Sequence, residues 1–281
     1  MAPGAPTLLC TMPLSELETG QFDRAEELFQ QLSGLLAENP VDPSFHFAAA
    51  TLVAGMTSWI STSPMDPAFP PKFADFMLSS PFTIPLFAKT TNVGLAFDAL
   101  ARGEIENCQR SYDALTKTSG TSHFIVIDRL LGQLAHATGA ISQAIEHFDG
   151  SLAFSAKAGF RPEYAWTCWG YAAALLERRG DGDRRRAEAL LEEALQISIE
   201  LGMPPLRLRV EYLISRLGEA PIPAHPGGLS DREVEVIRLM AAGRTDREIA
   251  EELIISIRTA STHVRNILNK TGASNRAEAA S

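Results

Sequence analysis

The chain has 281 residues and a net charge of −9, with 45% hydrophobic and 21% charged residues. This length predicts two domains, and the balanced composition excludes wholesale disorder. No apolar run reaches the length of a membrane-spanning helix, and the N-terminus shows no secretory signal. Three widely separated cysteines argue against a disulfide framework or a zinc cluster. We therefore expect a cytoplasmic protein without a metal, a cofactor or a membrane contact.

An internal repeat is visible in the glycine positions. Four glycines are each followed after five residues by a small side chain and after nine by a large one, in the sets Gly20/Ala25/Phe29, Gly103/Cys108/Tyr112, Gly139/Ala144/Phe148 and Gly182/Ala187/Leu191. A glycine ends one helix and a small residue lets the next pack closely, so the pattern predicts stacked helical hairpins. It loosely resembles tetratricopeptide-class repeats, and the 83 residues between the first two glycines leave room for two units.

Between these glycines, apolar residues recur at helical spacing. The predicted stripes are Phe124, Ile127, Leu131 and Leu134; Ile141, Ile145, Phe148 and Leu152; and Tyr164, Cys168, Tyr171, Ala172 and Leu175. No long alternating strand pattern occurs, so the fold class we predict is all-α. The alternative to stacked hairpins is an irregular all-α domain whose Ala- and Leu-rich helices match the pattern by accident.

One region interrupts the repeat. Six prolines lie between Pro64 and Pro85, and proline is excluded from helix interiors. Eight of the fourteen phenylalanines lie between Phe45 and Phe97, beside Trp59. Such a stretch could line a ligand pocket, although a core element with an irregular loop is the commoner outcome.

Residues 217–228 contain three prolines and three glycines, which is typical of a linker. We therefore predict a helical-repeat domain over residues 1–216 and a second domain over 229–281. The first 228 residues hold 17 basic and 26 acidic residues, which accounts for the whole net charge. Residues 253–277 hold four basic residues and no acid, so they form either a footprint for a polyanion or a solvated helix face.

Capping patterns mark short helices in the second domain. Ser230 with Glu233 and Thr245 with Glu248 have the spacing of capping boxes, which predicts helices over about 231–242 and 246–253. Gly243 would end the first of them. Residues 254–256 then predict a tight turn, with Ser256 capping a third helix over about 257–270. Two helices joined by such a turn form a helix-turn-helix.

The third predicted helix has two distinct faces. One face gathers the apolar residues Ile257, Ala260, Val264, Ile267 and Leu268. The opposite face holds only hydrogen-bond donors and no acid: Arg258, Thr259, Thr262, Arg265, Asn266, Asn269 and Lys270. Such a face suits the major groove of DNA, where Arg reads guanine and Asn reads adenine, whereas lysine holds phosphates. The alternative is a helix that is merely solvated.

These residues resemble the LuxR-type DNA-binding domain. The resemblance rests on 229–233, Gly243, 248–250, 253–256, 258–259, 263–270 and 274–279. It implies a four-helix domain whose third helix enters the major groove and whose last helix often contacts a second copy. Position by position, it implies that Ser261, Thr262 and Arg265 read bases and that Lys270 holds a phosphate. The candidate DNA contacts are therefore Arg247, Arg258, Thr259, Ser261, Thr262, Arg265, Asn266, Asn269 and Lys270.

Two positions depart from the family pattern. Thr259-Ala260-Ser261 stands where the family usually has Thr-Val-Lys, so a cation expected near DNA is missing. Thr245-Asp246 replaces the usual Ser-Asn, which preserves the cap but adds a negative charge near the DNA backbone. The chain also stops within the last helix of the family domain, which leads us to expect weaker dimerisation.

The upstream region, notably 161–195 and 201–204, resembles the helical repeats of large ATP-binding LuxR regulators. No GxxxxGK[ST] motif occurs, so we expect their nucleotide-hydrolysing module to be absent. Motifs of hydrolases and metalloenzymes are also missing, and the glycine-rich residues 180–183 read as a turn between helices. We therefore expect no enzyme activity.

Together these features predict a transcription regulator that binds double-stranded DNA as a homodimer. A protein partner or a small-molecule effector would act on the helical-repeat domain and so control promoter occupancy. Two alternatives stay open: a protein-interaction scaffold with a vestigial DNA module, and a small-molecule receptor that uses residues 45–97.

Overall fold

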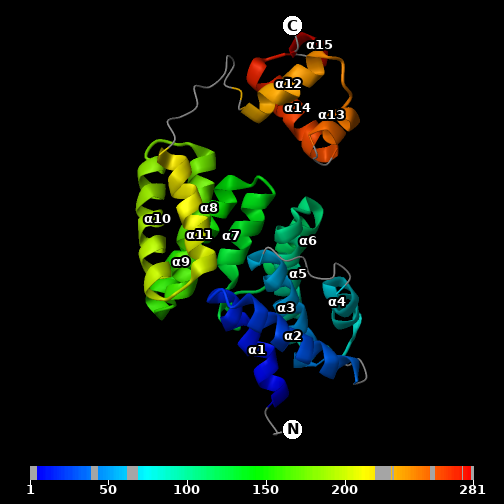
Figure 1. Cartoon of the computed structure of the whole chain (residues 1–281), viewed down its shortest axis with the longest axis vertical. Coiled ribbons are helices and arrows are strands. Elements are labelled where there is room, and N and C mark those ends of the chain that lie inside the picture. Colours follow the sequence, from blue (N-terminus) through cyan, green and yellow to red (C-terminus); the bar gives the residue numbers. More distant parts are fainter. Residues whose placement is uncertain are drawn as a thin grey trace. The chain divides into compact units, whose positions relative to one another are not determined.

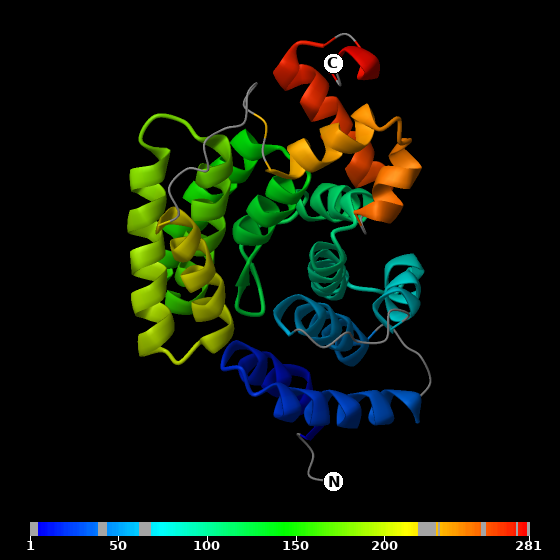
Figure 2. The same cartoon turned by 45° about the horizontal axis from the view of Figure 1, so that its top comes forward.

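The computed structural model describes residues 5–38, 44–61, 69–218, 229, 231–253, 257–273 and 275–279. The chain forms two compact units, residues 1–216 and 217–281. Both units are built from helices (Figures 1 and 2). Among the described residues, no helix is both long enough and apolar enough to cross a bilayer.

The first unit begins at the N-terminus and ends within its last helix. Its helices are α1 (Ala5–Glu18), α2 (Phe22–Ala37), α3 (Phe45–Ile60), α4 (Phe69–Ser79), α5 (Pro85–Arg102), α6 (Ile105–Leu115), α7 (Ile127–Ala137), α8 (Ile141–Ala158), α9 (Arg161–Arg178), α10 (Asp183–Glu200) and α11 (Pro204–Gly218). Two short antiparallel strands, β1 (Thr121–Ser122) and β2 (Ile125–Val126), lie between α6 and α7. Helix α11 extends to Gly218, two residues into the predicted linker, and residues 219–228 lie outside the described residues.

The four repeat glycines each lie between two packed helices. Gly20, Gly103, Gly139 and Gly182 have φ angles between 63° and 82°, a left-handed conformation that glycine adopts without strain. The small residue five positions later is at most 2% exposed in each set. The predicted hairpins are therefore confirmed as α1–α2, α5–α6, α7–α8 and α9–α10. The long interval between the first two glycines contains one further pair, α3 and α4.

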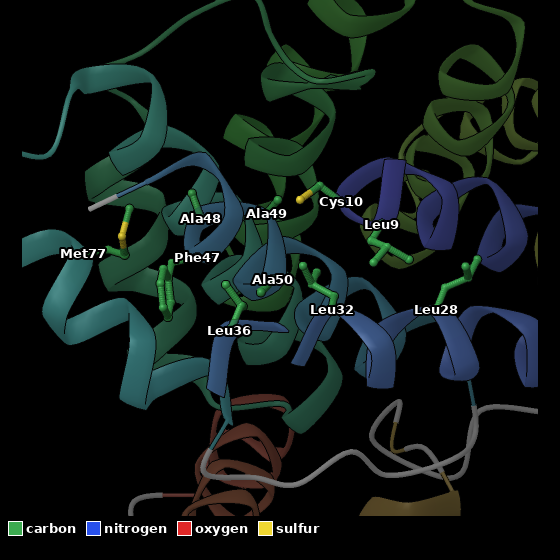
Figure 3. Packing of buried hydrophobic residues seen from close by; sticks show 10 residues of the cluster. All are labelled: Leu9, Cys10, Leu28, Leu32, Leu36, Phe47, Ala48, Ala49, Ala50 and Met77. Atoms are coloured by element: carbon green, nitrogen blue, oxygen red, sulfur yellow. The ribbon is translucent and has the colours of Figure 1, made fainter. Parts of the chain in front are cut away.

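The core of the first hairpins is formed by side chains from four helices (Figure 3). Leu9 and Cys10 of α1 lie beside three leucines of α2, and both groups pack against Phe47 and the alanines that follow it in α3. Met77 extends the cluster into α4. The small residues at 48–50 are fully buried. They let neighbouring helices approach closely, as stacked hairpins require.

One predicted helical stripe is wrong at its first residue. Phe124 lies in the turn between β1 and β2, before α7 begins, and its side chain is 37% exposed. The rest of that stripe, Ile127, Leu131 and Leu134, is buried on α7. The residues just before α7 form the β1–β2 hairpin. An apolar period of three or four positions does not reveal such a strand pair.

The aromatic segment, residues 45–97, contributes to the core. Phe47 and Phe97 are almost fully buried, and the ring of Trp59 lies 5.1 Å from that of Phe97. The prolines are compatible with helices, because Pro70 and Pro71 lie in the first turn of α4 and Pro85 is the first residue of α5. Residues 62–68, which include two of the predicted prolines, lie outside the described residues.

All three tryptophans of the chain meet in one place, together with two arginines. We call Trp59, Trp166, Trp169, Arg129 and Arg209 the tryptophan–arginine cluster. The guanidinium carbon of Arg209 lies 4.5 to 5.5 Å from the centres of the three indole rings. Because these residues come from α3, α7, α9 and α11, the cluster joins helices that are far apart in the sequence.

Glu18, at the end of α1, adds a titratable group to this cluster. Its carboxylate accepts a hydrogen bond of 2.7 Å from Nε1 of Trp166. Burial raises the pKa of Glu18 from 4.5 to about 7, opposed by that hydrogen bond and by the charges of Arg129 and Arg209. The charge of Glu163 raises the pKa further. Glu18 therefore holds its proton up to near-neutral pH in the folded chain.

This raised pKa predicts a pH-dependent stability. Between pH 4.5 and about 7 the folded chain binds more protons at Glu18 than the unfolded chain does, so the free energy of unfolding should fall as the pH rises. Above about pH 7 the contribution should level off. The Glu18→Gln variant has no titratable group at this position. Between pH 4.5 and about 7, the free energy of unfolding of the wild type should therefore fall by about 2–3 kcal/mol more than that of the variant. Urea unfolding at several pH values measures the difference, and parallel curves would contradict the prediction.

Candidate nucleic-acid interface

The second unit consists of four helices around a small apolar core. The helices are α12 (Asp231–Ala241), α13 (Asp246–Glu252), α14 (Ile257–Thr271) and α15 (Arg276–Ala279). Helix α14 packs on α12 and α13, and α15 contacts α12 and α14. The buried cluster holds Leu229, Val236, Met240, Ile249, Ala250, Ala260, Val264 and Ile267. The predicted helix ends are each within one residue of the observed ones.

A capping box starts the second helix of this unit. The backbone N–H of Glu248 donates to Oγ1 of Thr245 at 3.3 Å, and the N–H of Thr245 donates to Oε2 of Glu248 at 2.8 Å. These reciprocal bonds satisfy amides that the first turn of α13 leaves without partners, which confirms the predicted box. They also lower the pKa of Glu248. Ser230 and residues 254–256, to which the other predicted cap and the turn belong, lie outside the described residues.

The apolar face predicted for the third helix is buried at four of its five residues, and the side chain of Ile257 lies outside the described part of the structure. Ala260 and Ile267 are fully inaccessible, Val264 is 9% exposed, and Leu268 is half-buried against the same core. This packing fixes the rotation of α14 about its axis. The opposite side of the helix is thereby turned away from the core of its unit.

Four candidate DNA contacts on α14 are exposed: Ser261, Arg265, Asn266 and Lys270. Arg247, on α13, is exposed as well. Arg258, Thr259, Thr262 and Asn269 belong to α14, but their side chains lie outside the described part of the structure. Within that part, Arg265 and Asn266 make no hydrogen bond or ion pair to another residue, so both side chains are available to a partner.

Two of the exposed candidates are bonded within the unit. Oγ of Ser261 donates to Oδ2 of Asp246 at 2.6 Å. Nζ of Lys270 donates to Oε2 of Glu233 at 2.7 Å, and the Glu233 side chain is only 5% exposed. To hold a phosphate, Lys270 would have to leave or share this carboxylate.

Asp246 is the centre of a small polar network. Besides Ser261, it accepts a hydrogen bond of 2.5 Å from Nη1 of Arg276, whose Nη2 donates to the carbonyl oxygen of Arg244 at 2.6 Å. The bonds from Ser261 and Arg276, together with the arginine charge, lower the pKa of Asp246. The negative charge expected near the DNA backbone is therefore paired inside the unit.

The basic residues within 253–277 differ in whether they have a partner inside the unit. Arg276 and Lys270 are both ion-paired with carboxylates, whereas Arg265 is not. The sequence did not reveal these pairings, because the partners are 30 and 37 residues apart and no local spacing relates them. Arg265 is thus the cation on the described surface of α14 that stays available for an anionic partner.

This unit has a recognisable family. Residues 228–281 match the family model described as bacterial regulatory proteins, luxR family. The chain is 43% identical over 83 residues to the transcriptional regulatory protein LiaR of Bacillus subtilis, which covers 28% of this chain and 38% of that protein. No solved structure matches the chain.

Other relatives match beyond the C-terminal unit. The putative HTH-type transcriptional regulator Mb0914c of Mycobacterium bovis is 28% identical over 189 residues, or 64% of this chain and 20% of that protein. The HTH-type transcriptional regulator MalT of Vibrio cholerae is 32% identical over 102 residues, covering 36% and 11%. Both matches are longer than the C-terminal unit, so they include part of the first unit. The chain spans well under half the length of these curated relatives.

Proposed function

We propose that this chain, whose C-terminal unit is a luxR-family helix-turn-helix domain, regulates transcription by binding double-stranded DNA through α14. The observation that carries the proposal is the exposed, acid-free side of α14, on which Arg265 and Asn266 have no partner in the described structure. A helix held by its apolar side against α12 and α13 can present this surface to a major groove. The match to relatives named as transcription regulators supports the same function.

The side chains divide into two roles. Arg265 suits the O6 and N7 acceptors of guanine, and Asn266 suits the edge of adenine. Thr259 and Thr262 can touch thymine methyl groups, while Arg247, Arg258, Asn269 and Lys270 suit the phosphates and neighbouring base edges. The hydroxyl of Ser261 donates its hydrogen to Asp246, so toward DNA its oxygen can only accept a hydrogen bond.

Control would come from the first unit. One small helix-turn-helix domain binds a half-site weakly, and two linked domains gain affinity when both half-sites are occupied. We therefore propose that the chain acts in the cytoplasm as a homodimer and not as an enzyme. An effector or protein that changes the association of the helical-repeat unit would change promoter occupancy.

Replacing Arg265 with alanine tests the DNA-binding surface. The substitution should weaken binding to a preferred duplex by about 1–3 kcal/mol and relax the base preference at the contacted position, because a bidentate contact is lost. The measurement is fluorescence anisotropy with duplexes selected from genomic fragments that the wild-type protein enriches.

The matched control is Arg238→Ala, which removes the same charge from an exposed position on α12. Its affinity should stay close to that of the wild type. Equal losses in the two variants would mean that net charge alone drives binding, and unchanged binding of Arg265→Ala would mean that this surface does not face DNA.

The competing function is a protein-interaction scaffold whose DNA module has lost specificity. The internal bonds of Ser261 and Lys270 favour it, since both side chains are occupied within the unit. A salt titration separates the two functions. A specific regulator keeps its preference for one sequence as the salt concentration rises, whereas a vestigial module shows no preference at any salt concentration.

A further inference from the structure

The two arginines of the tryptophan–arginine cluster differ in how closely carboxylates match their charge. Arg129 donates to both oxygens of Glu163, at 2.9 and 2.8 Å, so its charge is matched. Arg209 has no carboxylate within hydrogen-bonding distance among the described residues; its Nη2 donates to the main-chain carbonyl of Trp59. Burial lowers the pKa of Arg209 to about 10, which leaves it charged at neutral pH. The charge of Glu18 acts on Arg209 without a hydrogen bond between them, and the raised pKa of Glu18 leaves that carboxyl only partly ionised near neutral pH. Arg209 can therefore still take an anion as a hydrogen-bonded partner.

Three hydrogen-bond donors around the cluster also have no partner in the described structure. They are Nη1 of Arg209, Nε1 of Trp169 and Nε2 of Gln133, and each atom is buried. Gln133 is only 6% exposed, and its Oε1 accepts a bond from Nη1 of Arg129, which leaves its amide N–H groups unused. Buried polar groups are nearly always bonded. All three unmet groups are donors, so the missing partner is an acceptor.

These donors belong to one place in the fold. The rings of Trp59 and Trp169 lie 6.2 Å apart, and Arg209 lies over both. Arg129 connects this group to Gln133, and Gln133 packs beside Gly170, the residue after Trp169. The side chains of Trp59, Trp169 and Arg209 are half-buried, so each keeps some surface exposed to water.

We propose that the tryptophan–arginine cluster binds a small organic carboxylate. The planar guanidinium of Arg209 matches the two oxygens of a carboxylate, and the N–H groups of Trp169 and Gln133 would bond the same group. The surrounding indole rings favour a flat, apolar body on that ligand. The regulatory role of this site rests on the proposed function. The site would give the helical-repeat unit an effector of defined chemistry.

Intrinsic fluorescence provides the test, because every tryptophan of the chain lies in the cluster. Benzoate is the probe, benzamide is its neutral isostere, and inorganic phosphate is a non-planar anion of comparable charge. Titration of the full-length protein with benzoate should change the fluorescence in a saturable way, with a Kd at or below about 1 mM. Benzamide and phosphate should bind at least about tenfold more weakly, because each lacks part of the recognised group.

Two variants tie the signal to the site. Arg209→Gln should weaken benzoate binding at least about tenfold, whereas Arg207→Gln, which removes an equal charge from an exposed position of α11, should bind like the wild type. Trp169→Phe keeps an aromatic ring but removes the donor, and should weaken binding several-fold. Circular dichroism and thermal unfolding identify any variant that does not fold. If one of the two variants fails to fold, the benzoate affinity of the other tests the site.

The proposal is overturned if benzoate gives no saturable change, if benzamide or phosphate binds as well, or if both folded variants bind like the wild type. None of these measurements contains DNA. Failure of the ligand site would therefore leave the Arg265 experiment and the proposed DNA binding untouched, and failure of DNA binding would leave the fluorescence titration untouched.

Discussion

Replacing Gly55 with alanine should lower the free energy of unfolding of the first unit by about 3 kcal/mol or more. Helices α3 and α5 cross where Gly55 faces Gly94. A Cβ atom on Gly55 would overlap the carbonyl oxygen of Gly94 and lie 2.8 Å from its carbonyl carbon. The obstruction is backbone, which cannot rotate away as a side chain can. The two helices would therefore have to separate, and core contacts on both would be lost.

Gly34→Ala is the matched control, because Gly34 lies inside helix α2 with no atom within 4 Å of the added Cβ. There the substitution should stabilise the unit by about 0.5–1 kcal/mol, since alanine loses less backbone entropy than glycine when a helix forms. Urea unfolding followed by tryptophan fluorescence reports on the first unit, which contains all three tryptophans. Equal effects of the two substitutions would mean that α3 and α5 do not cross closely.

Much of the fold could be predicted because its signals are local. A turn glycine with a small residue five positions later marks a hairpin, and Gly139 with Ala144 forms one as expected. In the second unit, Thr245 and Glu248 mark the start of α13 for the same reason. Such patterns act over one or two helical turns, so spacing along the chain is enough to detect them.

The contacts that could not be predicted join distant positions. Gly55 and Gly94 meet only because α3 and α5 are neighbours in space, and neither residue has a distinctive sequence context. The same is true of Trp59 and Arg209, which are 150 residues apart. Phe124 lies outside the predicted helix for a related reason, because a short strand pair interrupts the chain without changing its apolar period.

The candidate site shows the same division. The apolar face of α14 followed from helical periodicity and is buried as predicted at Ala260, Val264 and Ile267. Periodicity could not show that Ser261 and Lys270 bond to carboxylates of other helices. Which donors are available for DNA thus depends on tertiary contacts, and this is why Arg265 rather than Lys270 is the sharper test.

Replacing Glu163 with leucine should cost the first unit about 3–5 kcal/mol of unfolding free energy, because it breaks a buried ion pair. The Glu163 and Arg129 side chains are 5% and 1% exposed. The carboxylate accepts two bonds from Arg129 and a third, of 2.6 Å, from the N–H of Val126. Leucine would leave the buried guanidinium of Arg129 without its carboxylate, although its bond to Gln133 remains, and the buried amide of Val126 without an acceptor. The exposed pair of Arg24 and Glu27 is the control, where Glu27→Leu should cost less than about 1 kcal/mol.

The double variant Glu163→Leu/Arg129→Met separates the energy of the pair from the cost of stranding a charge. If most of the loss in Glu163→Leu comes from the unpaired guanidinium, removing that charge should restore a large part of the stability. Recovery should stay incomplete, because the Val126 amide still lacks its acceptor and Arg129 no longer lies over the rings of Trp59 and Phe97. Urea unfolding of the two single variants and the double variant measures the coupling. A double variant no more stable than Glu163→Leu would show that lost packing, and not the stranded charge, causes the destabilisation.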